Sequence, residues 1–162
     1  MTTCRQLSIE DVRQTILDEG NLIERNHGLT VELLSFAFEV KDIDSFEAFR
    51  QSEYDVYYEM IENQIDLVRK EHQDNHLSRR LLFQFDRFFY EDKPDDFLIC
   101  PESFCIFFID DTNYELLINL RSSDINRLGE DISIIKKIAQ EVFPGKSIIK
   151  AKVHCYNVHV YV

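Results

Sequence analysis

The chain has 162 residues, of which 44% are hydrophobic and 30% charged, an ordinary balance for a single globular domain spanning residues 1–162. The 30 acidic residues outnumber the 18 basic ones and give a net charge of −12, which argues against a nucleic-acid partner, because such proteins need a basic surface. A small phosphorylated ligand is compatible with this charge, since a few arginines placed together create a local positive field.

The four cysteines, Cys4, Cys100, Cys105 and Cys155, lack the short spacings of metal sites, so we expect free thiols and no bound metal. The first residues contain no apolar stretch of the kind found in a secretion signal. No apolar run approaches the length needed to cross a bilayer. The sequence therefore predicts a soluble, cytoplasmic protein without membrane contact.

The first predicted element is a helix over residues 8–19. Ser8 is a suitable N-cap, and Asp11 stands three positions later, where a capping box places its second side chain. Apolar residues recur with a helical period along this segment, and Gly20 directly after it is expected to end the helix.

The next elements are a strand and two helices. Residues 29–40 are rich in β-branched and aromatic side chains and predict a long, mostly buried strand after a loop over 21–28. A short helix is expected over 42–51. Residues 53–71 repeat apolar side chains with a period of about 3.6 and predict a longer helix.

The remaining chain predicts mostly strands. Residues 79–89 form one, and residues 98–109 and 114–120 form a hairpin around a polar turn. A helix over 125–142 precedes one or two strands over 147–162. Together these elements predict an α+β fold with a mixed or antiparallel sheet packed with a few helices.

Arginines stand at three predicted strand ends, namely Arg25, the pair Arg79 and Arg80, and Arg121. Ser122 follows the last of them. The guanidinium fork matches phosphate, and serine hydroxyls add short hydrogen bonds, so these residues suit a phosphorylated ligand. The alternative is that each arginine is an exposed charge at a strand end.

Cys100 follows two apolar residues and precedes Pro101. A thiolate near arginine has a lowered pKa and is nucleophilic, but a buried cysteine is more often a small hydrophobic residue. Cys105 and Cys155 are typical of a strand core.

Asn157, His159 and Tyr161 alternate along the last predicted strand and therefore share one face. Such a face suits recognition of hydroxyl groups or a base, or else it simply faces water.

The segments ERNHG, SRR, LRSSD and NVHVY occur in the order found in thymidylate synthases and pyrimidine nucleotide hydroxymethylases, and nearly the whole chain resembles this family. The resemblance implies that Arg25, Arg121 and Ser122 bind the nucleotide phosphate. It also implies a homodimer, in which Arg79 and Arg80 hold the phosphate bound by the partner subunit.

The resemblance gives roles to further residues. Asp124 is expected to face the folate and the pyrimidine, and His159 and Tyr161 to hold the 3′-hydroxyl of the sugar. Asn157 stands in the same substrate-binding segment. Asp131 is nearest to the position that reads the base, and aspartate there is typical of cytosine-preferring relatives, because a carboxylate accepts from the exocyclic amine.

The chemistry implied is C5 methyl or hydroxymethyl transfer to a pyrimidine nucleoside monophosphate (dCMP, CMP or dUMP), with methylenetetrahydrofolate as one-carbon donor. Cys100 is expected to be the nucleophile that adds to C6. Two residues are candidates for the catalytic glutamate: Glu32 in ELLSF, which copies the family's letters but lies in the first predicted strand, and Glu47. The chain ends after Val162, so we expect a domain truncated at its C-terminus, without the segment that closes over the ligands in the family. The alternative function is a catalytically inactive relative that binds a nucleotide or a protein partner.

Overall fold

The computed structural model describes residues 5–26, 28–74, 80–85 and 101–162. Its elements are β1 (Gln6–Leu7), α1 (Ile9–Glu19), β2 (Asn21–Arg25), β3 (Gly28–Val40), the 3-10 turn η1 (Ile43–Ser45), α2 (Gln51–Asp74), β4 (Arg80–Gln84), β5 (Pro101–Phe108), β6 (Asn113–Asp124), α4 (Ile125–Val142) and β7 (Ser147–Tyr161).

The seven described strands form one mixed sheet with the order β1-β3-β7-β6-β5-β4, and β2 pairs with β3. β6 and β7 are parallel, as are β1 and β3, whereas the other neighbours are antiparallel. The predicted α+β fold is therefore confirmed, and the sheet is of the mixed kind.

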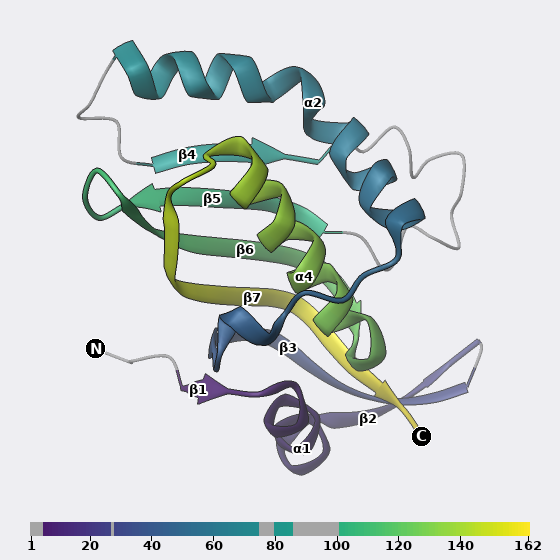
Figure 1. Cartoon of the computed structure of the whole chain (residues 1–162). Coiled ribbons are helices and arrows are strands. Elements are labelled where there is room, and N and C mark those ends of the chain that lie inside the picture. Colours follow the sequence, from purple (N-terminus) through teal and green to yellow (C-terminus); the bar gives the residue numbers. More distant parts are fainter. Residues whose placement is uncertain (1–4, 27, 75–79, 86–100) are drawn as a thin grey trace.

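The three α-helices of the described chain pack on one face of this sheet (Figure 1). α4 lies against β5, β6 and β7, while α1 packs on β3 and β7, and α2 on β4 and α4. Buried and partly exposed side chains alternate along β6, because one face of the strand meets the helices. We call the other face, which no described helix covers, the open face.

The predicted helices over 8–19, 53–71 and 125–142 are confirmed. Ser8 caps α1: its hydroxyl oxygen accepts from the Asp11 amide at 3.1 Å, and the Asp11 carboxylate accepts from the Ser8 amide at 3.0 Å. Gly20 ends the helix with extended backbone. A larger residue does not fit there, because a Cβ atom would lie 2.5 Å from the Ile16 carbonyl oxygen.

Other predictions need correction. The expected loop over 21–28 contains β2, which forms a hairpin with β3. The expected helix over 42–51 is only the turn η1 followed by irregular chain, because Phe46 and Phe49 pack against the core there instead of lining up along a helix. β6 continues through Asp124, beyond the predicted end at residue 120. The last segment, predicted as one or two strands, is the single strand β7.

Three neighbouring strands change their alternation at the same level of the sheet. Core-facing positions are three residues apart at Leu33 and Phe36 in β3, at Cys155 and Val158 in β7, and at Leu120 and Ser123 in β6. Ser35, in the first of these bends, has a left-handed φ of 52°. Irregularities of this kind redirect side chains and are common beside functional sites.

Candidate functional site

Beyond the three bends, β3, β6 and β7 carry polar residues on the open face, and β6 adds the buried Ser123 on the helix side. Two clusters of polar side chains lie here, one on the open face and one under the helices, and residues on or next to α2 and α4 supply most of the second cluster. The Arg121–Asp124 segment of β6 lies between the two clusters, since Ser123 faces the helices while Ser122 and Asp124 alternate with it.

The sheet-end cluster consists of Arg25, Thr30, Glu32, Asn157 and His159. Its centre is the carboxylate of Glu32, whose side chain is only 4% exposed. Arg25 donates to both carboxylate oxygens, at 2.8 and 2.5 Å. The Thr30 hydroxyl and the Asn157 amide donate at 2.5 and 2.8 Å. Four hydrogen bonds thus converge on one buried carboxylate.

These donors change the acidity of Glu32. The hydrogen bond from Arg25 is the largest influence and lowers the pKa of Glu32 to about 2, against the opposing effect of burial. The ionised form is therefore stable at neutral pH. Arg25, expected to bind phosphate, is instead held by an internal carboxylate in this structure.

His159 extends the cluster toward the end of the chain. Its Nδ1 atom lies 3.2 Å from the Asn157 side-chain oxygen, and its ring meets the Tyr161 ring nearly at right angles, with centroids 5.4 Å apart. The three residues therefore share one face of β7, as their alternation predicted. His159 is nearly buried, whereas Tyr161 is exposed.

The Arg121–Asp124 segment runs beside this cluster. Ser122 pairs with Asn157 across the parallel β6–β7 ladder, and Asp124 pairs with His159. Arg121 stands at the bend, between Leu120 and Ser122. Asp124 is also the N-cap of α4, where its Oδ1 atom accepts from the Asn126 amide at 3.0 Å. The segment thus joins the sheet end to the start of α4.

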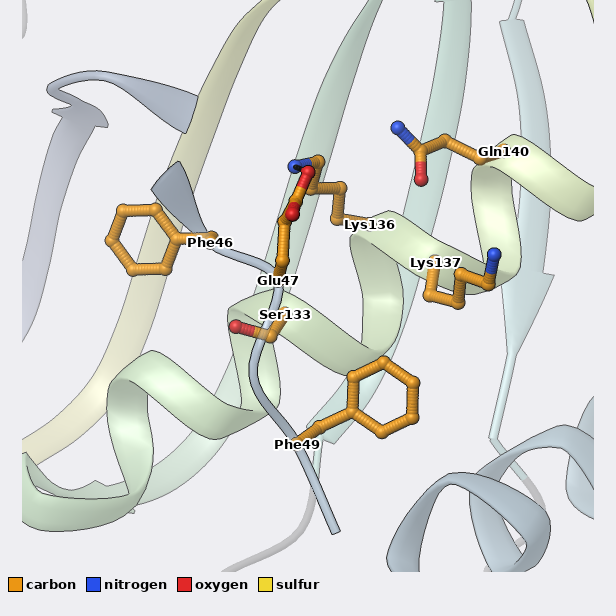
Figure 2. A pocket seen from close by; sticks show the side chains of 7 residues that line it. All are labelled: Phe46, Glu47, Phe49, Ser133, Lys136, Lys137 and Gln140. Atoms are coloured by element: carbon orange, nitrogen blue, oxygen red, sulfur yellow. Dashed lines mark ion pairs between the residues drawn. The ribbon is translucent and has the colours of Figure 1, made fainter. Parts of the chain in front are cut away.

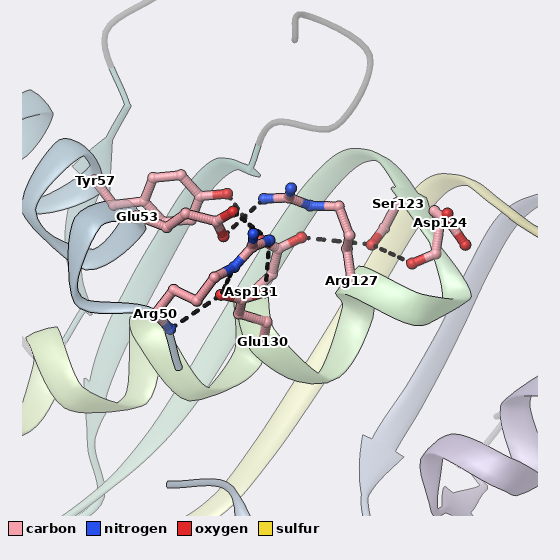
Figure 3. Close-up of polar contacts among 8 residues, drawn as sticks. All are labelled: Arg50, Glu53, Tyr57, Ser123, Asp124, Arg127, Glu130 and Asp131. Atoms are coloured by element: carbon pink, nitrogen blue, oxygen red, sulfur yellow. Dashed lines mark hydrogen bonds and ion pairs between the residues drawn. The ribbon is translucent and has the colours of Figure 1, made fainter. Parts of the chain in front are cut away.

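The helix-side cluster lies between the first turns of α2 and α4, above Ser123 (Figure 3). The Tyr57 hydroxyl donates to Asp131 at 2.8 Å, and the Ser123 hydroxyl lies 3.5 Å from the other oxygen of the same carboxylate. Around this pair, two arginines bridge two glutamates. The bridging residues are Arg50, Glu53, Arg127 and Glu130.

Asp131 is fully buried. Burial is the largest influence and raises the pKa of Asp131 to about 7, although the hydrogen bond from Tyr57 and the charge of Arg127 oppose the shift. The same burial, with the nearby Asp131 charge, raises the pKa of Tyr57, so the phenol remains a donor. Asp131 can therefore hold or release a proton near neutral pH.

The structure brings together Arg25, Arg121, Ser122, Asp124, Asn157, His159 and Tyr161 at one end of the sheet, with Asp131 on the helix side of the same strand ends. It does not bring Arg80 there, because Arg80 pairs with Phe107 near the opposite end of the sheet. Glu47 is also apart: it faces Lys136 on α4, at 3.9 Å. Arg79 and Cys100 lie outside the described residues.

Sequence reasoning missed most of the helix-side cluster. Tyr57 lies in the helix predicted over 53–71, whose apolar period does not single it out, and no pattern in the sequence marks Glu53 or Arg127. A signal was present, because Asp131 interrupts the apolar stripe of α4 between Leu128 and Ile135. A charged residue at such a position requires a buried partner.

Within the described ranges, no three His, Cys, Asp or Glu side chains come together as a metal site requires. In the same part of the chain, no helix is long and apolar enough to cross a membrane. The chain matches none of the models of known protein families, and no curated protein matches it in sequence.

Proposed function

We propose that the protein binds a pyrimidine nucleoside monophosphate at the end of the sheet where β3, β6 and β7 bend, and transfers a methyl or hydroxymethyl group to its C5 atom. The observation that supports binding is the register of Arg121–Asp124 beside Asn157 and His159. In this register, Arg121–Asp124, which suits an anion, runs beside Asn157 and His159, which suit sugar hydroxyls.

In this proposal, Arg121 and Ser122 bind the phosphate through charge-assisted and hydroxyl hydrogen bonds. His159, oriented by Asn157, and Tyr161 bind the sugar. No described residue is assigned to the base. Asp131, the expected candidate, is fully buried on the helix side of the sheet and hydrogen-bonded to Tyr57, whereas His159 and Tyr161 lie on the open face.

The proposed nucleophile is Cys100, whose thiolate adds to C6 and makes C5 nucleophilic. Methylenetetrahydrofolate is the proposed one-carbon donor: C5 would bond to its methylene carbon as a C–N bond to the folate breaks. C5 would then lose its proton and the thiolate would leave C6. Water would complete the hydroxymethyl product, and a hydride from the tetrahydrofolate would complete the methyl product. Asp124, expected to face the folate, uses one carboxylate oxygen to cap α4; among the described residues no hydrogen bond to its second oxygen is formed, so this oxygen can accept from a ligand.

A second candidate is a protein that binds the nucleotide, or a protein partner, without catalysis. Two observations favour it. Arg25 is engaged by Glu32, and Glu47, a candidate for the catalytic glutamate, faces Lys136 rather than the sheet-end cluster.

Tritium release from 5-tritiated dCMP and dUMP separates the two candidates. The transferase releases tritium when C5 is substituted, and Cys100→Ala abolishes the release, while Cys105→Ala, a buried strand residue, serves as control. If no pyrimidine monophosphate releases tritium but calorimetry still detects dCMP binding, the enzyme proposal fails and the binding protein stands.

The position of Arg80 supports a further proposal, a homodimer in which this residue reaches the site of the partner subunit. Arg80 is exposed and lies far from the sheet-end cluster of its own chain. A heterodimer of Arg80→Ala and Arg121→Ala subunits would then have one site with both arginines. Restored dCMP binding in the mixture supports the dimer. A purely monomeric protein in sedimentation equilibrium excludes it.

A further inference from the structure

A cavity of about 300 Å³ lies on the helical side of the molecule, between α4 and the irregular chain that follows η1 (Figure 2). Phe46, Glu47 and Phe49 line it from the irregular chain, and Ser133, Lys136 and Lys137 from α4. Its volume is at the lower end of the range for ligand pockets, which leaves room for one ring and a charged group.

The ammonium group of Lys136 is the unusual feature of this cavity. Its side chain is only 4% exposed, and a buried cation is costly unless it is well paired. Among the described residues, only the Asp44 carbonyl oxygen, at 3.3 Å, is within hydrogen-bond distance of Lys136 Nζ. A lysine ammonium group has three N–H donors, so it can donate to a further partner.

Glu47 covers this ammonium group loosely. Its carboxylate oxygen is 3.9 Å from Lys136 Nζ, too far for a hydrogen bond, and its side chain is 82% exposed. Moving such a side chain into water costs little, because most of it is already hydrated. The Glu47 carboxylate thus stands where the carboxylate of a ligand would make a closer contact.

The charges and walls of the cavity indicate the class of ligand. Lys136 faces Glu47 in the cavity, whereas Lys137 pairs with Glu141 at 3.8 Å, so Lys136 is the lining cation that a ligand carboxylate would meet. The lining contains no arginine fork for phosphate but has two phenylalanines. The Ser133 hydroxyl donates to the Gly129 carbonyl oxygen at 2.8 Å, so it offers an anion no proton.

From these contacts we infer that the cavity binds a small aromatic monocarboxylate. The ligand carboxylate replaces that of Glu47 beside Lys136, and its ring lies between Phe49 and α4 (Figure 2). This inference does not depend on the proposed nucleotide site, because the sheet-end cluster lies on the open face and the cavity lies on the helical side of the sheet.

Benzoate is a suitable probe, titrated into the full chain and followed by calorimetry and by amide chemical shifts. Benzamide has the same shape without the charge and tests the role of the ammonium group. Lys136→Met keeps the length of the side chain and removes its charge, Glu47→Gln removes the competing carboxylate, and Lys70→Met changes an exposed lysine of α2 outside the cavity.

We expect saturable benzoate binding with shifts at residues 46–49 and 133–137. Lys136→Met should weaken it at least about tenfold, since a charge-assisted hydrogen bond is lost. Glu47→Gln should strengthen binding severalfold, and Lys70→Met should leave it unchanged. The inference is overturned if benzoate fails to saturate wild type and Glu47→Gln, or if benzamide binds as tightly. Glu47 is exposed, so Glu47→Gln should fold. Its benzoate affinity therefore tests the inference even if Lys136→Met does not fold.

Discussion

The Tyr57 hydroxyl donates a 2.8 Å hydrogen bond to the buried carboxyl group of Asp131, joining α2 to α4. The bond holds in place a group whose pKa burial raises to about 7 from 3.8. Asp131 is therefore both a link between two helices and a source of pH dependence.

The first prediction concerns Asp131→Asn. Between pH 3.8 and about 7 the folded protein keeps the Asp131 proton that the unfolded chain releases, so stability falls as pH rises through this interval and then levels off. Asparagine carries no titrating proton, so the free energy of unfolding of Asp131→Asn relative to wild type should be a few kcal/mol higher at pH 8 than at pH 4. One pKa unit corresponds to about 1.4 kcal/mol. Urea unfolding at several pH values measures this. Asp111→Asn, in an exposed turn, is the control. Identical pH slopes for wild type and Asp131→Asn would contradict the prediction.

A second prediction concerns Glu32→Gln. The folded pKa of Glu32, about 2, is below its ordinary value of 4.5, so its contribution is present above pH 4.5 and is lost as pH falls toward 2. The substitution should cost about 1–3 kcal/mol at pH 7, toward the lower end because Arg25 is half exposed, and much less near pH 2. Glu24→Gln, exposed in β2, should be nearly neutral. A cost that is independent of pH would be inconsistent with the ion pair.

A third prediction concerns the outer edge of β4. The Gln64 side chain donates to the Gln84 carbonyl oxygen at 2.6 Å and accepts from the Gln84 amide at 2.9 Å, as a neighbouring strand would. Gln64→Ala should lower the free energy of unfolding by about 1–2 kcal/mol, because two backbone groups lose their partner. Gln73→Ala, exposed near the end of α2, should change it little. Chemical denaturation that gives equal stabilities for the two variants would refute this role of Gln64.

A fourth prediction compares two glycines. Gly20→Ala would place Cβ 2.9 Å from the Glu32 carbonyl oxygen as well as 2.5 Å from that of Ile16, and should cost roughly 2 kcal/mol or more. Gly129→Ala lies inside α4, and its Cβ would meet only side-chain atoms 3.8 and 3.9 Å away. It should raise stability by about 0.5–1 kcal/mol, because alanine favours helix. Melting temperatures that move in the same direction for both variants would argue against this comparison.

Several elements were predictable because local chemistry determines them. The Ser8–Asp11 capping box defines the start of α1, and the apolar period of α4 ends at Val142 as expected. β2 was not predictable from its own residues, since it is short and mostly exposed and exists through its pairing with β3. The failed helix over 42–51 is a tertiary effect, because the packing of Phe46 and Phe49 prevails over local propensity.

The candidate site also has parts that local sequence predicts and parts that depend on contacts between distant segments. The shared face of Asn157, His159 and Tyr161 follows from alternation and was predictable. The Arg25–Glu32 pair depends on the β2–β3 hairpin and on the left-handed turn at Ser35, which no glycine marked. The burial of Asp131 depends on α2 packing over α4, a contact between segments far apart in the chain.

Calorimetric titration with dCMP tests the central proposal most directly, because it measures nucleotide binding independently of catalysis. We expect saturable binding by wild type, and at least about tenfold weaker binding by Arg121→Ala, since a charged hydrogen bond to phosphate is lost. Lys70→Ala, which removes an exposed cation of α2, should bind like wild type. Absence of binding for dCMP, CMP and dUMP, or equal binding by Arg121→Ala, would contradict the proposed nucleotide site.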